Sequence, residues 1–562
     1  MRRCAHKVLV SFAAVLLFAS AAGCAAEQEP LSAARRVTVV VCTSLSAQQA
    51  VDGGMPALQS LAERGAIALV ASSPREVPPL HQVASGPAVE LIDAGDAASQ
   101  AAAVDRAIAQ AQEEAEGEAI IVVSEPLGSA HGFVCVAGEG IPAGLLASAN
   151  THRAGLIAAE DIAALVWELS GEPGPGARPV LSVVPEREAP ESLARSEAYF
   201  DAARAAQAPI VVVFGVLACV SVLALWALPL SRLREAARKY WTVVLSRSLL
   251  LSLCVPPVTL LARVLERHPA SAPRLLTLTV GAAGVLWIVA MAVMERRGVS
   301  AAVAAVCALA AAVAAADQLL GAPLAPATPL SYAPLAGFRF YGIGNEGAAI
   351  LVGSWLAACA LGGGWLPEPS WRRVTLASGI LVISVCSLPV LGANSVVAVW
   401  GTVLAGVFLA ETARGRLAWR DVALIAIAAV VAIAVVVGVE RLTGAGTHVG
   451  LAVNEAGQTG GAVGIVLERL TAVLLAYVEH PAALVGFAAW LVLAAVRLRP
   501  PAKLGTVLAA RPAVRSALTA ALAGGVVSSL TEDSSVVVMV LLALFAGVAL
   551  SAATADASLK EA

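Results

Sequence analysis

Charged residues are scarce in this chain. Asp, Glu, Lys and Arg make up 14% of its 562 residues, whereas 59% are apolar. A soluble protein carries about 25% charged residues, so most of this chain is expected to lie in lipid. The formal net charge of -3 is small, and no basic cluster is interleaved with aromatic residues. Nucleic acid is therefore not expected as a partner.

Cysteine motifs are also missing. None of the nine cysteines stands in a CxxC or a Cys/His spacing, so we expect no metal and no cofactor held by thiols. Five cysteines lie in apolar segments, where they are interpreted as small hydrophobic residues: Cys219, Cys254, Cys307, Cys359 and Cys386.

Residues 1–26 have the layout of an export signal. Three positive side chains precede an apolar run over 8–22, which ends at Gly23 and Cys24. Residues 21–24 (AAGC) resemble a lipoprotein processing box in which Ala21 stands where Leu is usual. Three alternatives remain open: lipidation of Cys24, an ordinary cleaved signal, or an uncleaved anchor. In each case the following residues are exported.

Residues 35–205 have a soluble composition with alternating strand and helix signals. The strand-like runs are 37–41, 120–123 and 180–184, and the helix-like runs are 55–64, 98–115 and 158–169. This alternation predicts an extracytoplasmic α/β domain with a largely parallel sheet.

Three pieces of this domain resemble the alkaline phosphatase and sulfatase superfamily. They are VTVVV at 37–41, MPALQSLAERGA at 55–66, and residues 148–171. The superfamily places a metal-binding Asp directly after the first strand, where this chain has Cys42 and Thr43. It places an Asp-His pair after a later strand, where this chain reads Ser124-Glu125-Pro126. The resemblance therefore implies the fold in a degenerate form, a pseudoenzyme without bound metal.

Other side chains of this domain and of one later loop are weaker candidates. Cys42 and Cys135 are either an oxidised pair or two buried thiols. His131 and His152 have no acidic or thiol residue at a ligand spacing, so they are expected on the surface. His448 and Arg441 belong to or adjoin the glycine-rich stretch 443–461 and are expected in a mobile loop.

Residues 209–551 form a series of apolar segments close to the length that spans a bilayer. About eleven spans are predicted: 209–229, 243–264, 275–294, 299–320, 346–364, 374–391, 396–411, 421–439, 480–497, 516–531 and 534–551. The stretch 461–478 is predicted to lie on the outer surface as a helix, and 552–562 is predicted to be a cytoplasmic tail.

Basic residues alternate between the loops of this series. If the first span runs inward, the inside loops hold most of them: Arg232, Arg234, Arg238, Lys239, Arg296, Arg297, Arg372, Arg373, Arg414, Arg416, Arg420, Arg497, Arg499, Lys503, Arg511 and Arg515. This agrees with the positive-inside rule and with an exported amino-terminal domain. The sequence predicts a multi-pass protein of the cell membrane.

Three polar motifs fall on the predicted outer side: 344–347 (GNEG), 392–395 (GANS) and 531–535 (TEDSS). Each begins a helix that runs inward, and helix amino-termini bind anions readily. Arg339 adds a planar fork for phosphate or carboxylate. The predicted substrate-binding residues are Arg339, Tyr341, Asn345, Glu346, Asn394, Ser395, Glu532, Asp533 and Ser534.

A simpler interpretation is that these motifs only cap helices. Asn345, Asn394, Thr531 and Ser534 are good N-cap residues, and acidic side chains suit a first helical turn. Against this, the last two spans have only about fifteen apolar residues each, which is short unless the turn between them dips into the membrane.

The segments GFRFYGIGNEG, GAN and TEDS also resemble an uncharacterised group of bacterial polytopic membrane proteins, many with an exported domain. This resemblance covers 330–550 and implies a site without naming a substrate. Three functions stay open: a carrier or flippase for an anionic or lipid-linked envelope precursor, a membrane-embedded transferase with Glu346, Glu532 or Asp533 as general base, and a scaffold or sensor. Membrane lipids are expected partners in all three.

Overall fold

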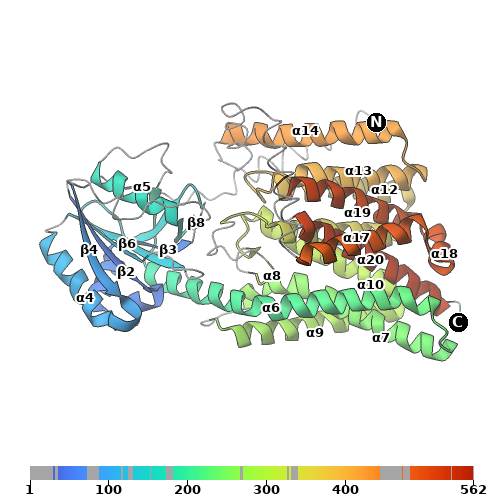
Figure 1. The fold of residues 1–562 in the computed structure, drawn as a ribbon, viewed down its shortest axis with the longest axis horizontal. Coiled ribbons are helices and arrows are strands. Elements are labelled where there is room, and N and C mark those ends of the chain that lie inside the picture. Colours follow the sequence, from blue (N-terminus) through green and yellow to red (C-terminus); the bar gives the residue numbers. More distant parts are fainter. Residues whose placement is uncertain are drawn as a thin grey trace.

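The computed structural model describes residues 29–31, 34, 36–71, 88–115, 118–124, 131–151, 153–171, 181–265, 270–325, 328–330, 340–443, 471, 481–532 and 535–560. The predicted export signal and most of the predicted surface helix lie outside these residues, as do His152 and His448. Within them, an α/β domain is joined end-on to a helical bundle (Figure 1).

Ten strands form one sheet in the order β1-β10-β7-β9-β3-β6-β5-β2-β4, with β8 beside β7. The strands are β1 (Glu29–Pro30), β2 (Val37–Thr43), β3 (Ala66–Ala71), β4 (Val89–Asp96), β5 (Ala119–Ser124), β6 (Gly132–Ala137), β7 (Gly144–Ser148), β8 (Arg153–Ala154), β9 (Leu156–Ala158) and β10 (Leu181–Pro185).

Helices cover both faces of this sheet. They are η1 (Ala47–Ala50), α2 (Pro56–Arg64), α4 (Ala97–Glu114) and α5 (Ala159–Ser170). Successive strand residues point to opposite faces, and so Val39 packs in the core under α5. Its neighbour Val40 packs with α2 and α4. The predicted α/β domain is therefore present.

The sheet is mixed, so the expectation of a largely parallel sheet is wrong. β2 pairs in parallel with β4 and β5, but β6 is antiparallel to both of its neighbours, β5 and β3. The reason is the short connection after Ser124, because β6 already begins at Gly132. A parallel return needs a crossover of a dozen or more residues, whereas an antiparallel return needs only a turn.

One helix joins the two parts. α6 (Ala189–Ala227) starts against the sheet and continues into the bundle, and Pro209 lies inside it. The predicted domain boundary at 205–209 therefore falls within a continuous helix. In its first half, which packs on the α/β domain, Leu193 and Phe200 are buried. Beyond the proline, the apolar side chains at 211–213 are exposed.

The bundle consists of helices that run back and forth along one direction (Figure 1). They are α7 (Glu235–Leu253), α8 (Val255–Leu265), α9 (Ala272–Arg297), α10 (Val299–Leu319), α11 (Asn345–Leu361), α12 (Glu368–Ser387), α13 (Val397–Arg414), α14 (Trp419–Thr443), α17 (Pro481–Leu498), α18 (Ala502–Ala510), α19 (Pro512–Thr531) and α20 (Ser535–Lys560). Short 3-10 turns follow α6 and α11, at η2 (Leu228–Leu230) and η5 (Gly362–Gly364). The predicted tail at 552–562 is helical up to Lys560.

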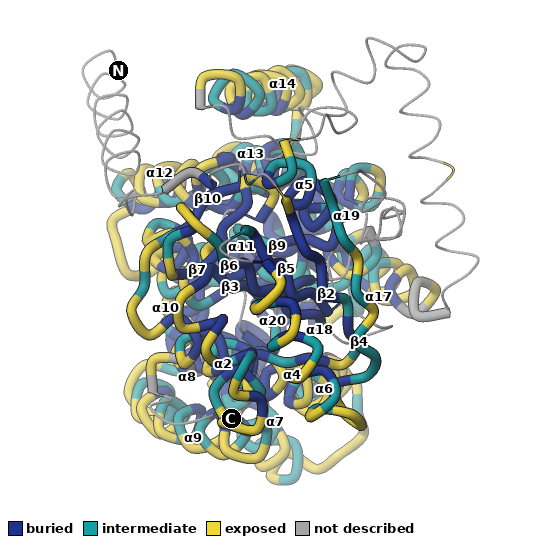
Figure 2. The backbone as a smooth tube through the Cα atoms, turned by 90° about the vertical axis from the view of Figure 1, so that its left-hand side faces the viewer, coloured by how far each residue is buried: buried dark blue, intermediate teal, exposed yellow. Residues whose placement is uncertain are grey.

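In the described part of the chain, nine helices are long and apolar enough to cross a membrane: α6, α7 with α8, α9, α10, α11, α13, α14, α19 and α20. The other two predicted spans, 374–391 and 480–497, fall on α12 and α17. Helix α14 is strongly apolar along its length, yet only about a tenth of its most apolar stretch is buried in the protein. Helix α14 packs against α13 on one side, and Figure 2 shows that much of its remaining surface is exposed. Such a helix needs an apolar surrounding.

The two ends of the bundle differ in charge. The α/β domain occupies one end, and the chain's carboxyl terminus lies at the other (Figure 1). Because the helices alternate in direction, the basic connections α6–α7, α9–α10, α11–α12, α13–α14 and α17–α19 all lie at the end away from the α/β domain. At that end Glu411 accepts from Arg497 over 2.7 Å, and Asp556 accepts from the backbone N–H of Val299 over 2.8 Å.

Candidate functional site

The amino-termini of α11, α13 and α20 lie at the bundle end that faces the α/β domain. Arg153 of β8 reaches this end: its Nε donates to the carbonyl of Phe340 and its Nη2 to the carbonyl of Ala322, each over 2.9 Å. Phe340 precedes α11, and Ala322 follows α10. The α/β domain therefore contacts the connections that lead into the predicted site.

Two glycines bring the first two motifs together. The backbone N–H of Ile343 donates to the carbonyl of Gly392 over 2.8 Å, and Gly342 has a φ of 73°. A Cβ on Gly342 would lie 2.2 Å from that same carbonyl oxygen. Only glycine fits such a left-handed conformation at this distance. The GNEG and GAN segments are thus joined through their backbones.

Their asparagines are joined as well. Asn394 donates from Nδ2 to Oδ1 of Asn345 over 2.9 Å, and both side chains are buried. The N-cap of α11 is Gly344, and neither α11 nor α13 has a side-chain cap. The capping interpretation is therefore wrong for these two asparagines: their amides bond across the bundle, 49 residues apart.

The third motif joins the site through a tryptophan. Glu532 directly follows α19 and is buried, and its Oε1 accepts from Nε1 of Trp400 on α13 over 2.8 Å. Thr531 ends α19 and donates to the carbonyl of Val527, so it does not act as an N-cap. Because α13 packs against α19, the carboxylate of Glu532 lies beside α13, the helix that follows Asn394. No pattern in the sequence indicates this role of Trp400, because an indole in an apolar span is expected to be part of the core.

Of the six remaining predicted site residues, the structure describes three. Tyr341 and Glu346 are half-buried beside Asn345, and Glu346 lies in the first turn of α11. Ser395 is buried, and its Oγ has no hydrogen-bond partner among the described residues. Arg339, Asp533 and Ser534 lie outside the described residues. The site thus contains carboxylate, amide and hydroxyl groups, drawn from three connections, within an apolar bundle.

At the carboxyl edge of β2 and β5, where the phosphatase resemblance puts metal ligands, the hydroxyl groups are engaged in hydrogen bonds to neighbouring residues. Ser124 accepts from the N–H of Leu45 over 3.2 Å, and Thr43 donates to Asp96 over 3.3 Å. Burial and the neighbouring Asp93 and Asp96 raise the pKa of the Cys42 thiol to about 12, so it is not a nucleophilic thiolate. Within the residues that the structure describes, no group of three or more His, Cys, Asp or Glu could hold a metal ion.

Cys42 and Cys135 are separate buried thiols. Of the two alternatives that the sequence left open, the oxidised pair is wrong. Cys42 donates from Sγ to the carbonyl of Val123 over 3.6 Å, and burial raises the pKa of Cys135 well above its usual range.

His131 is not a surface histidine, which corrects the expectation. Its side chain is 12% exposed, with Nε2 at 2.6 Å from Oε1 of Glu197 and Nδ1 at 3.8 Å from Oδ1 of Asp201. Burial lowers the pKa of His131, but the bond to Glu197 and the charges of both carboxylates outweigh it and raise the pKa overall. Glu197 also accepts from the N–H of Gln48 over 3.1 Å. No sequence spacing predicts this pair, because 66 residues separate its members.

Together, fold and site define a two-part protein: an α/β domain docked on the end of a bundle of apolar helices, with a polar cluster at that end. No protein-family model, curated protein or solved structure matches the chain. The site must therefore be interpreted from its own geometry.

Proposed function

We propose that this protein is a multi-pass protein of the cell membrane that carries an anionic, lipid-linked envelope precursor. In this proposal about eleven helices span the membrane, and the α/β domain, a degenerate relative of the alkaline phosphatase superfamily, lies outside the cytoplasm. The exposed apolar faces of α6, α9 and α14 support the membrane location, because in water these faces would have to be covered.

The charge distribution supports the orientation. The basic connections lie at the bundle end away from the α/β domain, and Lys and Arg are retained preferentially on the cytoplasmic side. The α/β domain and the polar cluster then face outward together. An exported domain at the mouth of the site is well placed to receive or release a substrate of the cell envelope.

The observation that carries the proposal is that three connections at one end of the bundle each bury a polar side chain. Asn345, Asn394 and Glu532 come from different parts of the chain, are each less than a tenth exposed, and bond to other side chains of the bundle. Polar groups buried among membrane helices are expensive and usually functional. The positive ends of the helix dipoles of α11, α13 and α20 favour an anionic group at the same end of the bundle.

Reconstitution tests the proposal. The full chain in proteoliposomes should move a fluorescent phosphate-bearing lipid between leaflets without changing it chemically, and Glu532→Gln should slow this movement by about tenfold or more. Thr554→Val, at the opposite end of the bundle, is the matched control and should transport normally. Transfer of a group to the lipid in detergent, where no transport occurs, would replace the carrier by a transferase. Lipid binding that survives all changes in the cluster would point to a scaffold and contradict both.

A further inference from the structure

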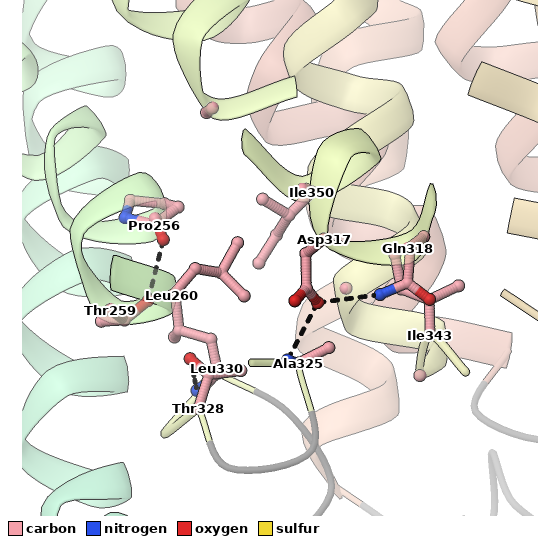
Figure 3. A pocket seen from close by; sticks show the side chains of 14 residues that line it. Pro256, Thr259, Leu260, Asp317, Gln318, Ala325, Thr328, Leu330, Ile343 and Ile350 are labelled. Atoms are coloured by element: carbon pink, nitrogen blue, oxygen red, sulfur yellow. Dashed lines mark hydrogen bonds between the residues drawn. The ribbon is translucent and has the colours of Figure 1, made fainter. Parts of the chain in front are cut away.

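The two ends of the bundle differ in how their charged groups are satisfied. At the end that faces the α/β domain, a small cavity lies between α8, α10 and the start of α11, and Thr259, Asp317 and Gln318 are among the side chains that line it. The Asp317 carboxylate accepts from the backbone N–H groups of Leu324 and Ala325, over 2.8 and 2.9 Å, and from the Gln318 amide (Figure 3). This carboxylate therefore has its partners within the protein.

At the opposite end, two stretches contain many more basic than acidic side chains. They are 411–421, around the connection from α13 to α14, and 497–515, around the connection from α17 to α19. The eight basic residues are Arg414, Arg416, Arg420, Arg497, Arg499, Lys503, Arg511 and Arg515, and the two acidic ones are Glu411 and Asp421.

Both acidic side chains are buried and already paired. Glu411 accepts from Nη2 of Arg497 over 2.7 Å, and Asp421 forms an ion pair with Arg414. Five basic side chains then have no carboxylate partner among the described residues, and we call them the basic patch: Arg416, Arg420, Arg499, Lys503 and Arg511. Their positive charges are not compensated within this part of the protein.

The two connections lie side by side, so the basic patch is shared between them. Nη2 of Arg515, in the first turn of α19, donates over 2.9 Å to the carbonyl of Gly415, which ends α13. Helix α18, which bridges α17 and α19, buries Leu504 and Leu508 and leaves Lys503 exposed. The patch therefore collects charges from segments about a hundred residues apart in the chain.

An apolar surface borders the basic patch. Trp419, next to Arg420, and Leu498, next to Arg499, are each 75% exposed. The Trp419 ring centroid lies 5.8 Å from the guanidinium of Arg420, and exposed tryptophans are typical of the level where lipid headgroups meet acyl chains. Further along α14 and α17 the exposed apolar side chains continue with Val422, Leu424, Ile427, Leu491 and Val492.

We propose that the basic patch binds the headgroups of anionic phospholipids, whose acyl chains cover the exposed apolar side chains of α14 and α17. Such a lipid joins a negative headgroup to an apolar chain, and this matches positive side chains beside an apolar surface. A zwitterionic lipid is bound less well, because its own ammonium group is repelled by the patch. The inference rests on the proposed membrane location but not on the carrier activity, since the polar cluster lies at the other end of the bundle.

Thermal unfolding of the purified full chain in a neutral detergent tests this, with phosphatidylglycerol and phosphatidylcholine of the same acyl chains titrated in parallel. A ligand that binds the native state raises the Tm in a saturable way. Phosphatidylglycerol should do so at a concentration lower than phosphatidylcholine by about tenfold or more. The difference should shrink as NaCl is raised from about 0.05 to 0.5 M, because salt screens exposed charges.

The combined variant Arg416→Gln, Lys503→Gln and Arg499→Gln removes three exposed charges from the basic patch. It should need about tenfold or more phosphatidylglycerol for the same rise in Tm, with its phosphatidylcholine titration unchanged. The charge-matched control combines Arg106→Gln, Arg187→Gln and Arg195→Gln, which are also exposed but lie in the α/β domain and the start of α6. It should titrate like wild type.

Equal titrations of wild type with the two lipids would overturn the proposal, and so would a patch variant that titrates phosphatidylglycerol like wild type. Washing cell membranes with alkaline carbonate separates this failure from a failure of the membrane location. A chain released by the wash would contradict both, whereas a retained chain without lipid preference would contradict the basic patch alone.

Discussion

Asn394 and Asn345 bond through their side-chain amides over 2.9 Å, deep between the connection before α13 and the first turn of α11. The same two segments are joined through the carbonyl of Gly392 and the N–H of Ile343. A side-chain bond and a backbone bond thus hold the two connections in one fixed register. This frame positions Glu346 and Ser395, which extend from the same two segments.

Removing either asparagine amide should destabilise this frame. Asn394→Leu leaves the Asn345 amide buried without its donor, which costs about 1–3 kcal/mol. Denaturant or thermal unfolding in detergent measures the loss. The double change Asn345→Leu with Asn394→Leu should cost less than the sum of the single changes; simple additivity would mean that the two amides do not stabilise each other.

The glycines at the backbone contact should tolerate no side chain. A Cβ on Gly392 would lie 2.5 Å from the carbonyl oxygens of Val385 and Cys386, and one on Gly342 would lie 2.2 Å from the carbonyl of Gly392. Gly342→Ala and Gly392→Ala should each lower the yield of monodisperse protein and the Tm, with a destabilisation above about 3 kcal/mol.

Gly281→Ala is the matched control for these glycine variants. Gly281 lies inside helix α9 with open space around its Cβ position, so alanine there should be neutral or stabilising. Size-exclusion profiles and melting curves of the three variants provide the comparison. A Gly342→Ala protein as stable as Gly281→Ala would contradict the observed contact.

We expect transport to depend on the negative charges of Glu532 and Glu346, and not only on the hydrogen bonds that these side chains make. Glu532→Gln retains an oxygen that can accept from Trp400, and Glu346→Gln retains size, so the Tm of both variants should stay near that of wild type. If the carboxylates of Glu532 and Glu346 hold neighbouring donors in place for an anionic headgroup, each change should weaken transport. We expect a fall of roughly tenfold to 150-fold, the equivalent of about 1.5–3 kcal/mol. Arg339→Lys, which loses the planar fork, should behave likewise. Full complementation of a deletion strain by all three variants would rule out the site.

The His131–Glu197 pair should make stability depend on pH. The pKa of His131 is raised in the folded state, so its stabilising contribution is complete below the ordinary pKa of 6.5 and is lost as the pH rises through the higher folded value. Asp201 adds to the rise and Arg204 opposes it. Unfolding free energies of wild type minus those of His131→Gln, measured between pH 5 and pH 9, should therefore decrease with pH. A constant difference would show that His131 does not titrate in this way.

Labelling of single cysteines tests the orientation in the membrane. Leu320 and Leu442 lie at the bundle end that faces the α/β domain, and Trp419 and Leu498 lie at the other, all of them at least 75% exposed. In a cysteine-free background, an impermeant maleimide added to intact cells should label Leu320→Cys and Leu442→Cys. Trp419→Cys and Leu498→Cys should react only after permeabilisation; their reaction in intact cells would reverse the proposed topology.

The two-part plan and the place of nearly every apolar helix could be predicted from the sequence alone. Those features depend on composition and local periodicity, which act over a few residues: the run 421–439 is apolar enough to predict α14 without any partner. The alternating basic connections likewise predicted which helix ends share a side.

Which polar groups contact one another depends on how the helices and strands pack. Whether Asn345 caps α11 or bonds to Asn394 depends on how α11 packs beside the turn before α13. Likewise, Glu532 accepts a hydrogen bond from Trp400 only because α19 packs on α13. His131 joins Glu197, and Asp317 with Gln318 comes to line a cavity with Thr259, for the same reason. These contacts join residues far apart in the chain, and their free energy depends on burial and distance in the folded state, which local sequence patterns do not encode.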